Sequence, residues 1–280
     1  MKTVVLARKI YGYPVLSNKD NVVRVVEKVL IQKISEFVDC PTLTITLDHQ
    51  NRVVVSFKGR DEDFIENLLV KEFGKKIDLD GIKKGDVVKG TLKLVGRIKY
   101  GFFVNVGIEE RDGTTVEVIL RKHVVEEQLF NGNSMMIKKM MYIYGFLMDY
   151  IPVEVEITEY DKFNRKVEGK FSEGFLLKIK EWLNQNQHLI FVTGVPRQAI
   201  KKTLAKAGFS LNVERIDRIG FLENLVKLFP KTNAPGVIAK IGKYIDSAKF
   251  GLFIPEKIRA ELKRKKEQED KQEDKQEQEQ

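Results

Sequence analysis

Cysteine, tryptophan and histidine are scarce in this chain of 280 residues, which holds one cysteine, one tryptophan and three histidines. Because Cys40 has no second thiol beside it, no disulfide can form within one chain and no cysteine-based zinc cluster can be built. His49, His123 and His188 stand far apart, and no HExxH spacing relates them. These absences argue against a disulfide-stabilised secreted scaffold and against a metal-dependent enzyme.

Long apolar segments are absent as well. Residues 1–15 alternate like a strand and lack the apolar core and the cleavage site of a signal peptide. The most apolar stretch, Met140–Leu147 with its flanks, is much shorter than the roughly 20 residues that span a bilayer. We expect a soluble, cytoplasmic protein of two or three domains, because a hydrophobic content of 42% is enough for ordinary cores.

Catalytic motifs are also missing, since the chain has neither GxxxxGK[ST] nor GxGxxG. The turn from Thr193 to Arg197 precedes a predicted helix and, with Lys201 and Lys202, offers a possible phosphate contact. An ordinary helix start explains the same residues without a ligand. Likewise, Asp61-Glu62-Asp63 is better explained as a negatively charged first helical turn than as a metal site. We therefore expect no catalytic residues, metal or cofactor.

Positive charge, in contrast, is abundant. The net charge is +9, and the segment Glu267–Gln280 carries −5 of its own, so residues 1–266 carry +14. Such an excess favours a polyanionic partner. The segment 257–280, with no apolar residue after Leu262, predicts a charged tail that is disordered or a solvated helix extension.

Two strand patterns joined by a short basic turn stand in the middle of the chain. Residues 87–95 alternate with a period of two, 96–99 form the turn, and an aromatic strand follows from Tyr100. The bend that Gly101 permits could bring Tyr100 and Phe103 to one outer surface. Exposed rings beside basic strands are suited to stacking on unpaired bases.

The residues Gly85–Gly90 (GDVVKG) and Tyr100–Gly107 (YGFFVNVG) resemble the first two strands of S-one-type OB-fold RNA-binding domains. A strand at 115–120, a short helix at 123–129 and a strand pair at 152–171 extend this resemblance over residues 83–172. It implies a five-stranded barrel that binds single-stranded or loop RNA. The arrangement of the whole chain also looks similar to uncharacterised archaeal proteins, which implies translation, ribosome function or RNA metabolism.

The resemblance also assigns an RNA site. Its stacking aromatics correspond to Tyr100 and Phe103, and Arg121 stands where the family often has histidine. The expected phosphate contacts are Lys89, Lys93, Arg97, Lys99, Arg165 and Lys166. The alternative is that the aromatic residues only fill and cap the barrel.

Residues 131–151 are an insertion relative to the family and hold five of the six methionines. Methionine-rich helices can bind protein partners or fill irregular cores. Both interpretations are open from the sequence.

The segments on either side of the barrel predict two small α+β domains of ferredoxin-like type. Residues 1–82 suggest strand, helix, strand, strand, helix, with a helix capped by Ser17 or Asn18. Residues 173–256 suggest a helix followed by β-α-β-β-α-β, with a hairpin turned at Glu223-Asn224. The predicted fold class is thus α+β, a central OB-type barrel flanked by two ferredoxin-like domains.

Taken together, these patterns predict a non-enzymatic RNA-binding protein whose partner is RNA, or a ribosome or other ribonucleoprotein complex. One alternative is a protein-interaction subunit of a ribosomal or transcription assembly, with the insertion as its docking element. Another is an enzyme on RNA or a nucleotide that uses the turn from Thr193 to Arg197.

Overall fold

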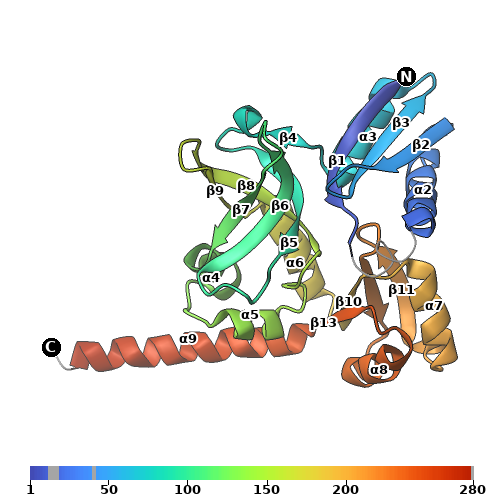
Figure 1. Cartoon of the computed structure of the whole chain (residues 1–280). Coiled ribbons are helices and arrows are strands. Elements are labelled where there is room, and N and C mark those ends of the chain that lie inside the picture. The colour runs from blue at the N-terminus through green and yellow to red at the C-terminus, as the bar shows by residue number, and fades with distance from the viewer. Residues whose placement is uncertain (12–18, 40–41, 279–280) are drawn as a thin grey trace.

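The computed structural model describes residues 1–11, 19–39 and 42–278 and contains three β-sheets with helices packed against them (Figure 1). A closed barrel lies beside two smaller antiparallel sheets, so the predicted α+β fold class is confirmed. The domain boundaries given above stay predictions. The predicted cap residues Ser17 and Asn18, and also Cys40, lie outside the described residues.

The first sheet belongs to the N-terminal unit. Its elements are β1 (Lys2–Lys9), α2 (Lys19–Ser35), β2 (Thr42–Leu47), β3 (Arg52–Lys58) and α3 (Glu62–Phe73). The strands are antiparallel in the order β1-β3-β2. Apolar residues at helical spacing in α2, such as Val22, Val26 and Val29, are buried against the sheet. After α3 the chain returns along the free edge of β1, where Leu6 pairs with Lys75.

The barrel is built from β5 (Val87–Lys93), β6 (Gly101–Glu109), β7 (Thr115–Arg121), β8 (Pro152–Asp161) and β9 (Lys166–Phe171). Its strand order is β6-β5-β8-β9-β7, and the pairing of β6 with β7 closes it. All neighbours are antiparallel except β7 and β9, which run parallel. The short β4 (Ile77–Asp78) and the turn η1 (Leu79–Gly81) lead into the barrel, and β4 pairs with β6. Below the barrel lies α4 (Lys122–Phe130), with Val125 and Phe130 in the core.

The third sheet follows α6 (Glu173–Asn184). Its elements are β10 (Leu189–Thr193), α7 (Arg197–Lys206), η2 (Ser210–Asn212), β11 (Val213–Arg218), β12 (Asn224–Leu228), α8 (Ala234–Ile241), η3 (Gly242–Tyr244) and β13 (Lys249–Phe253). The antiparallel order β11-β12-β10-β13 is that of the split βαβ arrangement. Asn233 caps α8 by accepting a hydrogen bond from the Gly236 amide at 3.2 Å.

The predicted hairpin turn at Glu223-Asn224 is wrong. The strands end at Arg218 and resume at Asn224, so the loop comprises residues 219–223. Phe221 and Leu222, whose apolar character suggested a continuing strand, are buried in the core of the N-terminal unit. The Phe221 ring stacks on Phe73, with centroids 4.7 Å apart. This loop therefore joins the first and third sheets.

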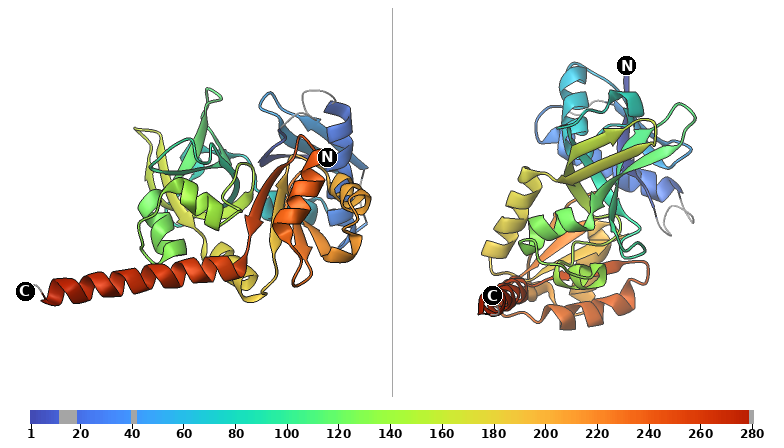
Figure 2. Two further views of the ribbon diagram at one scale, coloured as in Figure 1. Left: turned by 90° about the horizontal axis from the view of Figure 1, so that it is seen from below. Right: turned by 90° about the vertical axis from the view of Figure 1, so that its left-hand side faces the viewer.

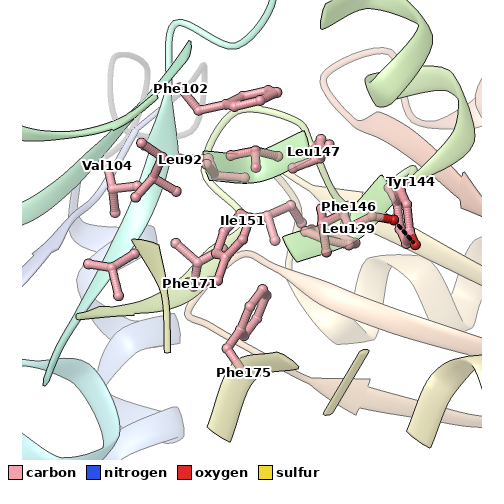
Figure 3. Close-up of a cluster of buried hydrophobic side chains, with 14 of the residues drawn as sticks. Leu92, Phe102, Val104, Leu129, Tyr144, Phe146, Leu147, Ile151, Phe171 and Phe175 are labelled. Carbon is pink, nitrogen blue, oxygen red and sulfur yellow. Dashed lines mark hydrogen bonds between the residues drawn. The ribbon is translucent and has the colours of Figure 1, made fainter. Parts of the chain in front are cut away.

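The methionine-rich insertion joins the barrel to the third sheet. Its helix α5 (Ile137–Ile143) buries Met140 completely, whereas Met136 is exposed. Tyr144 pairs with Phe253 of β13, and its hydroxyl donates to the Leu129 carbonyl at 3.0 Å. Figure 3 shows the ring of Phe146 beside Phe171 and Phe175, in a cluster that continues to Trp182 and Phe191. These contacts support the core-filling interpretation of the insertion.

A buried ion pair joins the N-terminal unit to the barrel. Arg52, with 0% of its side chain exposed, donates to Glu109 at the end of β6. Lys76 also lies 3.0 Å from Glu109. The backbones of β6 and β1 also approach closely at this interface. A side chain at Gly107 (φ +82°) would collide with Ala7, so glycine is required there.

The C-terminal helix α9 (Pro255–Gln278) runs beneath the barrel and extends beyond it (Figures 1 and 2). Its first turns are held by the buried Ile258 and by Arg259, which donates to the Leu183 carbonyl. The predicted charged tail therefore continues as a helix. Among the described residues, no helix is both long and apolar enough to cross a membrane.

Candidate nucleic-acid interface

Tyr100 and Phe103 form an aromatic pair on the outer face of the barrel. Phe102 between them points inward and is fully buried, whereas 52% of Tyr100 is exposed and Phe103 is half-buried. The two rings meet edge to face, with centroids 6.2 Å apart. Gly101 makes this possible, since a side chain there would collide with the backbone of Leu120. The structure thus brings the two predicted stacking residues together.

The register of the sheet places Phe103 in the middle of a row of side chains. Lys93 of β5 is opposite Phe103, Phe103 is opposite Ile119 of β7, and Ile119 is opposite Glu168 of β9. Alternation along each strand directs these residues outward, because Leu92, Val104 and Val118 are buried inside the barrel. The outer face therefore has an aromatic and apolar centre with charged residues on both sides.

Most of the predicted cations on this face are held by carboxylates. Arg121 donates through Nε and Nη2 to Oε1 of Glu168, at 3.0 and 2.6 Å. The same oxygen lies 2.6 Å from the amine of Lys166. Lys93 is paired with Glu117. Chiefly the Arg121 guanidinium, and then Lys166, lower the pKa of Glu168 to about 2 against the burial that opposes ionisation.

Arg97 and Lys99 are different. Both are exposed on the loop that joins β5 to β6, and neither forms an ion pair within the described ranges. The loop turns at Gly96, whose φ of +78° favours glycine. Lys99 precedes Tyr100 directly, so the unpaired charge lies next to the exposed ring.

The structure places two other predicted phosphate contacts elsewhere. Arg165 lies 3.1 Å from Glu110, which follows β6, so it is at the opposite end of that strand from Tyr100. Lys89, four residues before Lys93 on β5, lines a cavity between the three sheets. Neither residue belongs to the surface around Tyr100 and Phe103.

The turn from Thr193 to Arg197 is largely occupied by the protein itself. Thr193 is 1% exposed, and the Tyr11 hydroxyl has the Thr193 side chain and the Gly194 amide as hydrogen-bond partners. The Val195 amide donates to the Leu222 carbonyl at 3.3 Å. Arg197 lines the cavity just mentioned, and Lys201 and Lys202 are exposed along α7.

Several charged residues that line the cavity escaped the sequence analysis, namely Arg8, Lys178 and Arg218. They come from β1, α6 and β11, and no spacing in the chain relates them. Only the general excess of positive charge pointed to an anionic partner. Among the described residues, no group of three or more His, Cys, Asp or Glu side chains could hold a metal ion.

Comparison with known proteins gives one family match, since residues 187–253 match the family described as the DUF2110 C-terminal domain. No curated protein matches the chain.

Among solved structures, an uncharacterised protein from Methanocaldococcus jannaschii is similar at 17% identity and a TM-score of 0.22, over 33% of this chain and 95% of its own. A structure of an a/eIF2alpha-aDim2p-rRNA complex from Pyrococcus horikoshii matches at 13% identity and a TM-score of 0.24, over 45% of this chain and 64% of that one. The intact alpha subunit of aIF2 from Pyrococcus abyssi matches at 10% identity and a TM-score of 0.22, over 60% of this chain and 97% of its own. At these TM-scores the similarities support no argument about function.

Proposed function

We propose that this chain is a non-enzymatic RNA-binding protein that holds single-stranded or loop RNA on an S-one-type barrel and acts in translation or RNA metabolism. The observation that carries the proposal is the aromatic pair on the outer face of a closed five-stranded barrel, with Tyr100 exposed and Phe103 half-buried. A base stacked on such a ring gains about 1–3 kcal/mol without regard to its identity.

The charged residues around the aromatic pair have different roles in this proposal. Arg97 and Lys99, which are free of carboxylates in the described part of the chain, contact the phosphates on either side of the stacked base. Arg121 is opposite Gly101, the residue after Tyr100, and Glu168 holds its guanidinium through two hydrogen bonds. Lys93 and Lys166 contribute less to RNA affinity, because each is paired with a carboxylate whose negative charge offsets its attraction for phosphate.

The test is fluorescence anisotropy with a labelled single-stranded oligoribonucleotide over a series of salt concentrations. We expect the affinity to fall with salt, and Tyr100→Ala/Phe103→Ala to lose about 1–3 kcal/mol for each unstacked base. The matched control is Phe163→Ala, which removes a ring that is 96% exposed at the turn between β8 and β9. If the double variant binds like the parent, the aromatic pair is not an RNA contact.

A second pair of variants separates charge from stacking. Arg97→Ala/Lys99→Ala removes two phosphate contacts, so the slope of log affinity against log salt flattens by roughly 1.4 for a single strand. Magnesium-dependent turnover of RNA or of a nucleotide by the parent protein would contradict the non-enzymatic proposal.

A protein-interaction subunit is the second candidate, and one observation favours it. An apolar cavity of about 690 Å³ lies between the insertion and the third sheet, lined by Tyr142, Met148, Phe250 and Leu252 among others. Tyr142 is 76% exposed beside it. If affinity purification recovers one defined partner with the parent but not with Tyr142→Ser, and RNA does not bind, this candidate replaces the first.

A further inference from the structure

A second cavity, of about 690 Å³, lies where the N-terminal unit, the barrel and the C-terminal sheet meet. Its walls include Arg8 of β1, Lys89 of β5, Lys178 of α6 and Arg218 of β11. Arg197, at the start of α7, lines it as well. Five cations from three parts of the fold therefore face one space, beside a sixth, Lys33, which pairs with Glu36 and Glu72. This space is separate from the aromatic pair on the outer barrel face.

None of these five cations forms an ion pair with a carboxylate among the residues that the structure describes. Arg8 is 7% exposed and donates to the Ile219 carbonyl at 3.0 Å, while its Nε has no partner in the described ranges. Arg218 donates to the Gln32 side chain at 3.0 Å. The amine of Lys178 lies 5.6 Å from the centre of the Trp182 ring.

The carboxylates that line the same cavity have other partners. Glu36 and Glu72 lie 3.3 and 3.8 Å from Lys33, and Asp217 lies 2.9 Å from Arg215. Glu154 accepts a hydrogen bond from the Ser172 hydroxyl at 2.7 Å. Acidic side chains thus lie among the cations, and Glu72 and Glu154 oppose the loss of solvent that lowers the pKa of Lys89. Among the described residues, none of the carboxylates that line the cavity is within ion-pair distance of the five cations.

Crowding makes these charges costly. Loss of solvent lowers the pKa of Lys178, and the nearby Lys89 and Arg8 lower it further, although the side chain reaches water in the cavity. Loss of solvent likewise lowers the pKa of Lys89 and of Arg218, the latter with help from Arg197. An anion placed among them would remove this repulsion and would gain charge-assisted hydrogen bonds.

One part of the wall is apolar and includes Phe73, Ile151, Phe175 and Trp182. A volume of about 690 Å³ is in the range of small-molecule sites. We propose that this cavity binds a small phosphorylated molecule of mononucleotide size, with its phosphate among Lys89, Lys178 and Arg218 and its body against the apolar wall. A phosphate fits better than a single carboxylate because it offers more charge and more acceptor oxygens to several cations.

The experiment is isothermal titration calorimetry on the full chain at low salt, with AMP, ATP, inorganic phosphate and adenosine as probes. The cavity variant is Lys178→Met/Arg218→Met. Its matched control is Lys180→Met/Lys243→Met, which removes two exposed lysines outside the cavity and without ion pairs in the described chain. Circular dichroism and a melting curve establish that each variant is folded.

We expect AMP or ATP to bind once per chain, phosphate alone to bind more weakly and adenosine not to bind. The cavity variant should lose about tenfold or more in affinity, as the loss of charged hydrogen bonds predicts, while the control stays close to the parent. Absence of saturable binding by every phosphorylated probe overturns the proposal, and so does a cavity variant that binds like the parent.

RNA is the competing occupant, and the barrel variant distinguishes it. Tyr100→Ala/Phe103→Ala should keep full nucleotide affinity, so the failure of RNA binding on the barrel and the failure of this proposal are separate results. If the cavity variant loses RNA affinity while no nucleotide binds to the parent, the cavity belongs to an RNA path and the proposal is wrong.

Discussion

The outer barrel face and the cavity between the three sheets use positive charge in opposite ways. On the barrel face, Lys93, Arg121 and Lys166 are held by Glu117 and Glu168. In the cavity, cations such as Lys178 and Arg218 line one space and form no ion pair in the described part of the chain. The face thus orients its cations, whereas the cavity leaves five of its cations without a carboxylate at ion-pair distance in the described part of the chain.

This difference explains why a count of lysines and arginines along strands does not show which of them are free to bind an anion. Oppositely charged side chains on neighbouring strands form favourable pairs, as Arg121 of β7 and Glu168 of β9 do. A cation that has lost solvent and has no ion-pair partner lowers stability. Such cations are therefore concentrated at functional sites, where a ligand supplies the opposite charge. The unpaired cations of the cavity are therefore stronger candidates for ligand contacts than the paired cations on the barrel strands.

The largest expected effect concerns the buried pair of Arg52 and Glu109, where charge is both paired and removed from water. Among the described residues, Glu109→Gln leaves the buried Arg52 with only the more distant carboxylate of Asp48, at 3.9 Å, which should lower the free energy of unfolding by about 3–5 kcal/mol. Urea unfolding of the parent and the variant measures this difference in free energy. Glu110→Gln is the control. Its partner Arg165 is 57% exposed and can be solvated by water, so loss of the Glu110 charge should cost much less stability. Equal losses in the two variants would contradict the distinction between buried and exposed pairs.

A second prediction concerns Glu168 and the pH dependence of stability. Its pKa falls from the usual 4.5 to about 2 in the folded protein, so its contribution is fully present above pH 4.5. That contribution is lost as the pH falls from 4.5 toward 2. Glu168→Gln should therefore be less stable at pH 7 and should lose less on acidification, which melting curves from pH 2 to 7 will measure.

The same variant tests the barrel face as an RNA surface. Because Glu168→Gln releases Arg121 and Lys166 from a negative charge, RNA affinity at low salt should increase. An unchanged affinity in the anisotropy assay would place the RNA elsewhere. Glu156→Gln, which removes a carboxylate 3.3 Å from Lys170, is the matched control.

The smallest effect is expected in the empty cavity. Lys178 has a lowered pKa, so its charged form costs stability below that pKa, and the cost is relieved as the pH rises toward 10.5. Lys178→Met should thus leave the melting temperature at pH 7 unchanged or slightly raised, within about 0.5 kcal/mol. Lys180→Met provides the comparison. A clear loss of stability specific to Lys178→Met would mean that this cation is already paired.

Much of the fold could be predicted because its causes are local. The alternation of residues 87–95, the turn at Gly96 and the close approach at Gly101 define the first barrel hairpin without help from distant residues. The loop at residues 219–223 could not be predicted. Phe221 and Leu222 match a strand pattern locally, and only the core of a different sheet explains why they leave the strand.

The sequence by itself determined the first hairpin of the barrel and the pairing of Tyr100 with Phe103 across Gly101, because each depends on residues close together in the chain. The closed barrel, in which β5 pairs with β8 and β7 with β9, is expected only from the family resemblance. Tertiary structure alone decided which cations are free. Lys89 and Lys166 look alike as strand lysines, yet one faces the cavity and the other a carboxylate. Whether a charge is paired depends on side chains brought together from distant segments and on the solvent they exclude, and neither quantity is written in the local pattern.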